Sequence, residues 1–163
     1  MTAQLAAPAF APALRRLQTI PGVGPIVAAT IVAVLSEVRR FADAKHAASY
    51  AGLVPSTYHS GDREAYGRRI TKRGPGELRA MLCEAAHHAS RPTHPLHPYF
   101  ALLCAKRGYK MATIAVAHRL ARITFAMLRD GTNFDVAKLN IEEGPFERTI
   151  IRRYRVKRPA ARA

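Results

Sequence analysis

The sequence predicts a mainly α-helical protein of the α+β class, in which one small β-hairpin lies between a first pair of helices and a helical bundle. Apolar residues recur at helical spacing in several segments, for example at Leu78, Leu82 and Ala89. Glycines and prolines separate these segments from one another. One stretch instead holds two short runs whose connecting loop is bordered by Gly61 and Gly67, which is typical of a hairpin.

The predicted elements follow one another along most of the chain. Residues 1–12, rich in alanine and proline, are expected to form a flexible arm. One domain is expected over 13–134, because a chain of 163 residues can bury one modest core. The basic tail, 135–163, is expected to stay disordered until it meets a polyanion. Helices are predicted at 13–19, 25–38, 43–50, 76–89, 96–106 and 110–129, and strands at 56–60 and 68–72.

Single residues indicate where these helices begin and end. Pro25 suits a first helical turn, where its missing N–H group costs no hydrogen bond. Asp43 can cap the N-terminus of the next helix, and Gly131 can stop the last one. The segment 25–38 is apolar nearly all round, which predicts a buried helix.

The charge of the chain points to a polyanionic partner. Lys and Arg number 26 against 11 Asp and Glu, which gives a formal net charge of +15. Nucleic acid is the commonest partner of such a protein, because neutralised phosphates release their counterions. Ribosomal and membrane-surface proteins carry similar charge, so charge alone leaves the class open. The two cysteines, Cys83 and Cys104, show no metal-site or disulfide spacing. No secretory signal is recognised, so a cytoplasmic protein that does not enter a membrane is expected.

A glycine-rich turn separates the first two predicted helices. The run Ile20-Pro21-Gly22-Val23-Gly24 resembles the helix-hairpin-helix DNA-binding motif. Two glycines allow a tight turn whose bare backbone can approach a ligand closely. The N–H groups of the turn, backed by the dipole of the next helix, would then bind phosphate without reading base sequence. Gly22, Val23 and Gly24 are therefore predicted DNA-binding residues, and a corner without a ligand is the alternative interpretation.

The same motif occurs in base-excision glycosylases, which makes an enzyme of that class a further candidate. Those proteins often carry a catalytic lysine directly after the second glycine. Here Pro25 and Ile26 follow Gly24, so that lysine is missing. Asp43 lies at a plausible distance for the second catalytic residue, but a helix cap explains it better. The glycosylase interpretation is therefore weak.

The predicted hairpin carries a serine among many basic residues. Ser60 precedes Gly61, and five cations lie in the same short region, in the loop, on the returning strand and directly after it. A serine hydroxyl can attack a phosphodiester when a base takes its proton and cations stabilise the transition state. A Ser-Gly pair is most often only a turn. The five cations, which are also predicted to bind DNA, are Arg63, Arg68, Arg69, Lys72 and Arg73.

Several motifs in the same order carry a more specific resemblance. Ile20 to Gly24, Tyr50-Ala51-Gly52-Leu53-Val54-Pro55, Ser60-Gly61 and Ile70-Thr71-Lys72 together look like the C-terminal domain of insertion-sequence transposases that join an acidic-tetrad nuclease domain to a serine-bearing domain. The similarity runs over about 14–134. It implies DNA transposition, with Ser60 as the nucleophile that cleaves a phosphodiester and exchanges strands. Some members are guided by a bridge RNA, so the resemblance implies DNA and leaves open a guide RNA as partners.

The chain departs from this family in one respect. The acidic tetrad belongs to an N-terminal domain without a counterpart here, and no metal ligands are predicted in this chain. Mg²⁺ is expected to come from that acidic domain, in a homo-oligomer or in a complex with the nuclease domain. The isolated chain is therefore expected to be inactive. The alternative is a non-catalytic nucleic-acid-binding module or a decayed transposase fragment.

Four histidines raise the question of a metal site. His87 and His88 are adjacent and diverge around a helix, while Pro95 separates His94 from His97. No acidic residue completes a ligand set. Exposed or phosphate-facing histidines are therefore predicted.

Overall fold

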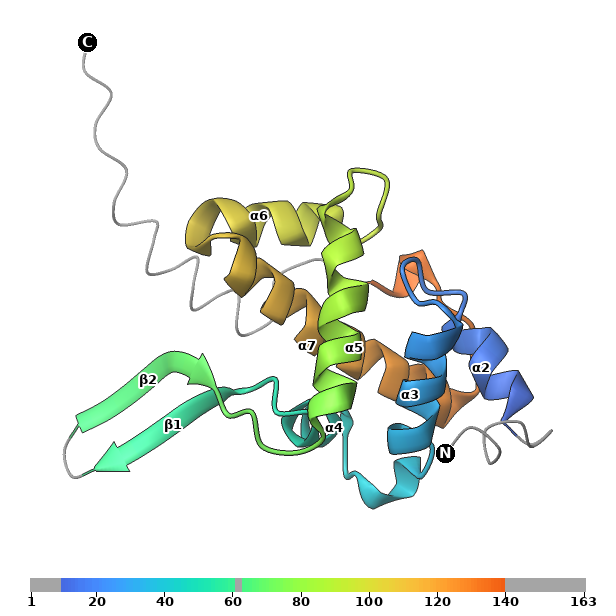
Figure 1. Cartoon of the computed structure of the whole chain (residues 1–163), viewed down its shortest axis with the longest axis horizontal. Helices are drawn as coiled ribbons and strands as arrows, with labels where there is room; N and C mark the ends of the chain where they lie inside the picture. Colours follow the sequence, from blue (N-terminus) through green and yellow to red (C-terminus); the bar gives the residue numbers. More distant parts are fainter. Residues whose placement is uncertain (1–9, 61–62, 140–163) are drawn as a thin grey trace, which may run out of the picture.

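The computed structural model describes residues 10–60 and 63–139, and between residues 56 and 69 it describes the backbone alone. Within this part of the chain the protein is mainly helical, which confirms the predicted class in its coarse form. Figure 1 shows the helices packed into one body, with a two-stranded arm extending from one end. The elements are α2 (Ala11–Leu17), α3 (Pro25–Leu35), η1 (Val38–Arg40), α4 (Ala44–Tyr50), β1 (Pro55–Ser60), β2 (Arg63–Ile70), α5 (Gly76–His87), η2 (His88–Ser90), α6 (His97–Arg107), α7 (Tyr109–Asp130) and η3 (Val136–Lys138).

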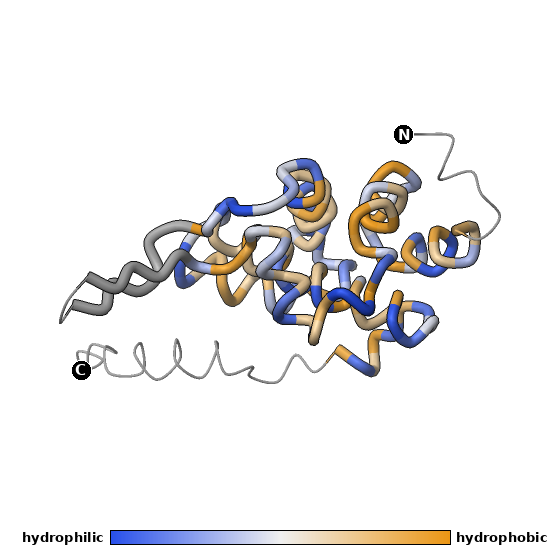
Figure 2. The backbone as a smooth tube through the Cα atoms, turned by 90° about the horizontal axis from the view of Figure 1, so that it is seen from below, coloured by the Kyte–Doolittle hydropathy of each residue, from blue (hydrophilic) through white to orange (hydrophobic). Residues whose placement is uncertain are grey.

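Helix α7 lies at the centre of the core. It packs against α4, α5 and α6, and makes further contacts with α2 and α3. Its inner face is apolar and fully buried at Val116, Leu120 and Phe125. Figure 2 shows hydrophobic stretches, in orange, in many segments of the helical body. By length and composition α7 could cross a membrane, but half of its most apolar window is buried inside the protein. The helix ends at Gly131, which adopts the left-handed conformation of a C-terminal stop, with φ of 63°.

Helices α2 and α3 begin and end at slightly different residues from those predicted. α2 starts at Ala11, because Pro12 fits a first helical turn. α3 ends at Leu35, and the 3₁₀ turn η1 follows it. The prediction that this segment is buried all round is wrong, since the side chain of Ile26 is 76% exposed. α3 lies at the edge of the body and packs against α2, α5 and α7, so only one of its faces is covered.

Asp43 caps the N-terminus of α4, as its position before the helix predicts. Its Oδ1 accepts hydrogen bonds from the amide of Lys45 at 2.7 Å and the amide of His46 at 2.9 Å. The same oxygen lies 2.9 Å from Nδ1 of His46. The backbone hydrogen bond from His46, followed by the contact with its ring, lowers the pKa of Asp43 from 3.8 to about 2.

Replacing Asp43 by asparagine is expected to make the free energy of unfolding less dependent on pH in acid. The unfolded chain binds the Asp43 proton first, so the cap stabilises the fold above pH 3.8 and this contribution is lost as the pH falls towards about 2. The free energy of unfolding, measured in denaturant across this pH range, should therefore fall less steeply in Asp43→Asn than in the parent protein. An asparagine oxygen can still cap the helix at neutral pH. Equal slopes in the two proteins would contradict the assignment.

The two strands of the arm run antiparallel. Pro55 pairs with Ile70 and Ser60 pairs with Arg63, with an irregularity between Pro55 and Thr57. β2 therefore begins earlier than the predicted strand and ends at Ile70 instead of Lys72. Lys72 leaves the strand because its backbone has a φ of 53°, in the left-handed region. Lys72 was predicted to be the last residue of the strand 68–72, and it lies outside β2.

Candidate nucleic-acid interface

The glycine-rich segment forms a tight turn between α2 and α3. Gly22 has a φ of 83°, a conformation that residues with a side chain rarely adopt. The amide of Val23 donates to the carbonyl of Ile20 at 3.0 Å, which closes the turn. Ile20 and Val23 are 1% and 6% exposed. Their side chains therefore anchor the turn in the core, while Gly24 lies at the surface.

The backbone N–H groups of this turn are available to a ligand. The first hydrogen bond of α3 runs from the amide of Ala28 to the carbonyl of Gly24, at 2.9 Å. Within the described part of the chain, the amides of Gly22, Gly24 and Ile26 have no backbone acceptor. A methyl group added at Gly24 would meet no atom within 4 Å, so the surroundings of this glycine are open. The positive end of the α3 dipole lies behind these groups.

A distant segment covers one side of the turn. His94, in the loop after η2, is only 6% exposed, and its Nε2 donates to the carbonyl oxygen of Pro21 at 3.0 Å. Its Nδ1 accepts a hydrogen bond from the amide of Leu96, also at 3.0 Å. A methyl group at Gly22 would lie 2.7 Å from Cβ of His88, which lines a shallow hollow together with residues 18–24. The prediction of exposed histidines is wrong for His94, because this loop folds back onto the turn.

The other end of the turn is held by a segment that follows α7. The hydroxyl of Thr19 donates to the carbonyl of Arg16 at 2.6 Å and accepts from the amide of Phe134 at 2.9 Å. Segments on both sides therefore restrain the turn. Arg15, in the last turn of α2, is exposed, and residues 18–24 include no acidic side chain.

The arm carries most of the other predicted site residues. Ser60 is the last residue of β1, and its backbone pairs with Arg63, the first residue of β2. Arg68 and Arg69 belong to β2. The side chains of these four residues lie outside the part of the structure that is described. Lys72 and Arg73, which follow β2, are exposed.

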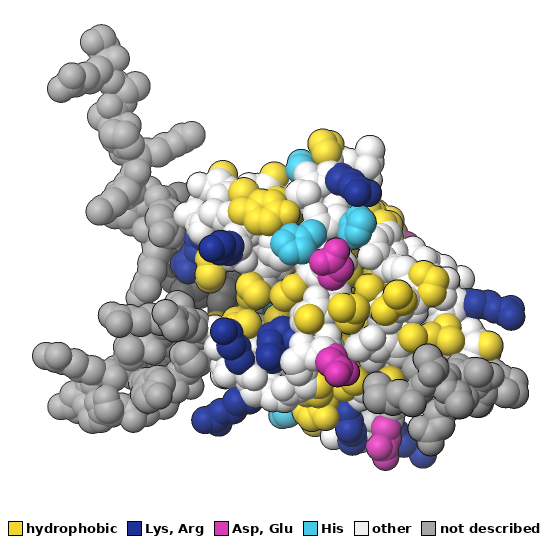
Figure 3. Space-filling model, viewed as in Figure 1, with side chains coloured by type: hydrophobic (Ala, Val, Ile, Leu, Met, Phe, Trp, Pro, Cys, Tyr) yellow, Lys and Arg dark blue, Asp and Glu magenta, His cyan; other side chains and the backbone are white. Residues whose placement is uncertain are grey.

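The arm and the glycine turn occupy different parts of the molecule. Figure 1 shows the arm at one end of the long axis, and the turn between α2 and α3 near the other end. The structure therefore does not bring Gly22, Val23 and Gly24 together with Ser60. Figure 3 shows Lys and Arg side chains distributed over the intervening surface, with few acidic side chains among them.

Two glycines form the junction between the arm and the helical body. Gly52 and Gly74 have φ angles of 70° and 90°. A methyl group at Gly74 would collide with the carbonyl oxygen of Tyr50, and one at Gly52 with the carbonyl oxygen of Arg73. The chain segments that enter and leave the arm therefore cross with their backbones in contact. The amide of Lys72 donates to the carbonyl of Gly52 at 3.2 Å, which ties the two segments together.

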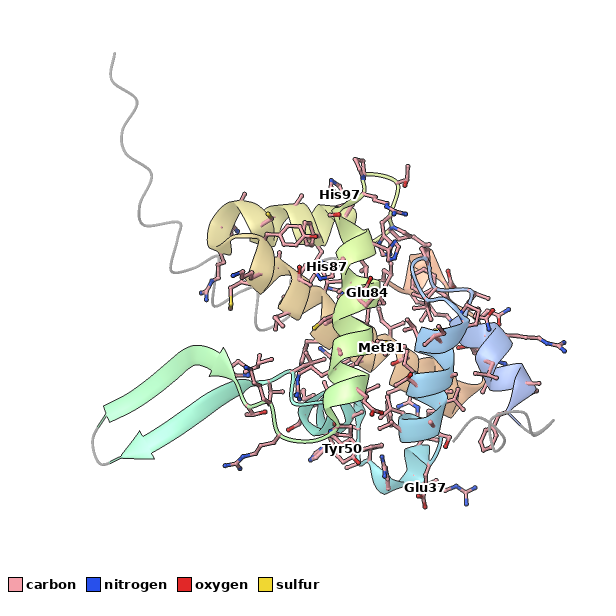
Figure 4. The ribbon with its side chains drawn as sticks, in the orientation of Figure 1. Glu37, Tyr50, Met81, Glu84, His87 and His97 are labelled. Atoms are coloured by element: carbon pink, nitrogen blue, oxygen red, sulfur yellow. The ribbon has the colours of Figure 1, made fainter. Side chains whose placement is uncertain are left out.

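The described acidic and histidine side chains do not fit a Mg²⁺ site. Glu84 and His87 lie on α5, while His97 begins α6 and Glu37 lies at the opposite end of the body (Figure 4). Among the side chains that the structure describes, those of residues 10–55 and 70–139, no three His, Cys, Asp or Glu gather as metal ligands would. His87 instead pairs with Tyr109, whose hydroxyl lies 3.0 Å from its Nδ1.

The sequence does not predict that the later histidines lie against the glycine turn. It indicates Gly22, Val23 and Gly24 as one site and predicts exposed or phosphate-facing histidines, with no link between His88 or His94 and the turn. The only sign in the sequence is the proline-rich loop between two predicted helices, and its composition does not indicate which other segment the loop contacts.

Comparison with known proteins supplies a family. The model of the transposase IS116/IS110/IS902 family matches residues 14–101, which include both the glycine turn and the arm. The transposase for insertion sequence element IS1111A of Coxiella burnetii is 31% identical over 118 residues, covering 70% of this chain and 32% of the relative. A pilin gene-inverting protein of Moraxella lacunata is 33% identical over 121 residues, covering 73% of this chain and 38% of the relative.

A third relative is a 43.6 kDa protein of insertion element IS110 from Streptomyces coelicolor. It is 30% identical over 120 residues, covering 73% of this chain and 29% of the relative. The chain therefore spans about a third of the length of the curated relatives it matches.

Proposed function

Because this chain belongs to the transposase IS116/IS110/IS902 family, we propose that it is the part of a DNA transposase that engages DNA and presents a serine nucleophile. The glycine turn binds backbone phosphates, and Ser60 on the arm cleaves a phosphodiester for strand exchange. The observation that carries the binding step is the set of turn amides at Gly22, Gly24 and Ile26, which have no backbone acceptor in the described chain. Completion of the enzyme requires an acidic, Mg²⁺-binding domain in addition to these residues.

The turn has the properties that a phosphate site requires. The amides of Gly22, Gly24 and Ile26 have no backbone acceptor in the described chain and adjoin the N-terminus of an 11-residue helix, so partial positive charge is concentrated at the turn. The side chains of Ile20 and Val23 are used for anchoring, which leaves bare backbone at the surface. A backbone site of this kind contacts the sugar-phosphate chain and carries no base preference. The net charge of +15 favours the same ligand.

The proposed chemistry at Ser60 is a phosphoryl transfer in two balanced steps. The serine oxygen attacks phosphorus, the bond from phosphorus to one deoxyribose oxygen breaks, and that oxygen takes up the proton that the serine lost. A deoxyribose hydroxyl of the exchanging strand then attacks the same phosphorus and releases Ser60, which regains its proton. The phosphoserine ester conserves the energy of the cleaved phosphodiester bond between the two steps, so no external energy source is needed. Arg63, the register partner of Ser60, is the nearest predicted cation along the strands.

Replacing Gly24 by alanine is expected to weaken DNA binding while leaving the protein folded. The backbone of Gly24 has an ordinary φ of −82° and open surroundings, so the free protein accommodates the methyl group. A phosphate in contact with the backbone would meet that methyl group, and loss of a charge-assisted hydrogen bond should lower the affinity about tenfold. Affinity for a short fluorescent DNA duplex at fixed salt measures the effect.

The matched control is alanine at Gly76, the first residue of α5, where a methyl group would touch only the end of the Arg79 side chain, at 3.6 Å. This variant lies outside the turn and should bind DNA like the parent protein. Unchanged affinity in Gly24→Ala would show that the turn does not contact the DNA backbone.

A non-catalytic nucleic-acid-binding module is the second candidate function. The charge of the chain and the exposed turn favour it, because both can bind phosphates without catalysing a reaction. It is distinguished by a steep salt dependence of binding and by the absence of a covalent protein–DNA product at every Mg²⁺ concentration.

We also propose a guide RNA and a second copy of the chain as further partners. RNA that copurifies with the protein tests for the guide RNA, and the mass of the particle in solution tests for the second copy of the chain.

A further inference from the structure

The loop between η2 and α6 reaches back over 73 residues of sequence to contact the glycine turn. The contact is the hydrogen bond from Nε2 of His94 to the carbonyl oxygen of Pro21. Beside it, the Cβ of His88 lies where a side chain at Gly22 would have to be placed. The turn is therefore not a self-contained motif, because a second segment determines the space around it.

The two hydrogen bonds of His94 define its protonation state. A carbonyl oxygen only accepts, so Nε2 must carry a proton towards Pro21. The amide of Leu96 only donates, so Nδ1 must be unprotonated. The ring is therefore neutral, in the Nε2–H tautomer. Burial lowers the pKa of His94 below 6.5, the hydrogen bond to Pro21 acts in the opposite direction, and positive charge on His88 or His97 lowers it further.

The geometry of the peptide bond transmits this contact to the binding surface. The peptide between Pro21 and Gly22 is trans, so its carbonyl and its N–H group point in opposite directions. A Pro21 carbonyl held inward on buried His94 therefore directs the Gly22 N–H away from the core. Rotation of this peptide would turn the N–H group away from a phosphate and would break the bond to His94.

We propose that His94 is the positioning residue of the phosphate-binding turn, and that its Nε2–H group sets the orientation of the Gly22 amide that meets the DNA backbone. This role rests on the proposed function of the turn. His94 itself lies beneath the surface and acts through Pro21, so it touches no DNA.

The protonation of His94 gives the role a pH dependence with a definite sign. The unfolded chain takes up a proton near pH 6.5, whereas folded His94 does so only at lower pH, so the stability that neutral His94 contributes falls progressively below pH 6.5, and the turn loosens once the folded His94 is protonated. Protonation of Nδ1 removes the acceptor for the amide of Leu96 and loosens the loop. His88 and His97 are the titratable groups that act on His94, and residues 18–24 of the turn carry no charged side chain.

The experiment compares two replacements of His94 in the full chain. His94→Phe fills a similar space but makes neither hydrogen bond, and it should lower the affinity for a short fluorescent DNA duplex about tenfold. His94→Gln keeps an N–H donor for Pro21 and should restore affinity to within about twofold, because a single hydrogen bond of typical strength is retained. His97→Phe is the matched control, since its Nδ1 contacts the carbonyl of Ala89, at 3.1 Å, and not the turn.

Two further readouts separate positioning from general stability. In nitrogen-15 spectra the Gly22 amide resonance should shift in His94→Phe and stay near its parent position in His94→Gln. The affinity of the parent relative to His94→Gln should fall as the pH drops below 6.5 and through the lowered pKa of folded His94. This comparison cancels the other histidines, and it applies even if His94→Phe does not fold.

The possible results fall into distinct sets. Weaker binding in His94→Phe, rescue in His94→Gln and normal binding in His97→Phe support the proposal. If Gly24→Ala binds weakly but His94→Phe binds like the parent, the positioning role is overturned and the turn remains the DNA site. If both variants bind like the parent, the proposed function of the turn fails and the inference fails with it. A pH-independent ratio between parent and His94→Gln would also overturn it.

Discussion

Alanine at Ser60 is expected to abolish covalent attachment of the protein to DNA while leaving DNA binding unchanged. Without the hydroxyl no phosphoserine ester can form, and loss of a catalytic nucleophile lowers turnover by more than about a thousandfold. Binding should persist because the proposed phosphate contacts of the glycine turn lie in another part of the molecule, away from the arm. The measurement is a denaturing gel of the chain assembled with its acidic domain, Mg²⁺ and labelled insertion-element DNA, followed by mass spectrometry of the modified peptide.

Ser56 provides the matched control for this experiment. It is a serine in the same strand, β1, and Ser56→Ala should form the adduct at the parent level. An adduct that persists in Ser60→Ala would remove Ser60 from the mechanism. If the parent protein forms no adduct at any Mg²⁺ concentration, the non-catalytic binding module becomes the better description.

Alanine at Gly74 is expected to cause the largest loss of stability among alanine substitutions at the glycines whose surroundings the structure describes. The φ of 90° alone costs a residue with a side chain about 1–2 kcal/mol. The added methyl group would also overlap the carbonyl oxygen of Tyr50, which is backbone and cannot rotate away. Overpacking of this kind adds about 1–3 kcal/mol, so a total near 3 kcal/mol or more is expected. Equilibrium unfolding in urea, followed by circular dichroism, measures the change.

Two other glycines separate the causes of this effect. Gly108 has a similar φ, 81°, with a ψ of 166° that is essentially restricted to glycine, but nothing lies within 4 Å of an added methyl group, so Gly108→Ala should show only a backbone cost of about 1–3 kcal/mol. Gly76 has neither a positive φ nor a close contact, and Gly76→Ala should be neutral or stabilising by up to about 1 kcal/mol. Equal losses at Gly74 and Gly108 would show that the crossing of the two segments beneath the arm is not tightly packed.

This crossing also connects stability to the proposed chemistry. The arm that carries Ser60 joins the body through two segments that touch at Gly52 and Gly74. The hydrogen bond from Lys72 to Gly52 and the one from the amide of Thr71 to the carbonyl of Val54, at 2.9 Å, continue this contact towards the strands. A fixed junction of this kind would aim the arm at a defined position relative to the helical body.

The sequence by itself determined the features that depend on near neighbours along the chain. Pro25 begins α3, Asp43 caps α4 and Gly131 stops α7, all as predicted, because each acts on backbone within four residues of itself. The core face of α5 follows in the same way from helical spacing, with Leu78 and Leu82 fully buried. The motifs that indicated a transposase are also short runs, and the family match includes the first of them, beginning with Ile20.

Only the tertiary structure decided which of these runs meet. His94 bonds to Pro21 across 73 residues, and Gly74 lies against Tyr50 because two segments cross. The exposure of Ile26 was equally invisible, since its neighbours along the helix are as apolar as those of a buried residue. The physical reason is that helix and turn preferences act between residues a few positions apart. Contacts between distant segments depend instead on how all the apolar faces are buried at once, and no local pattern encodes that arrangement.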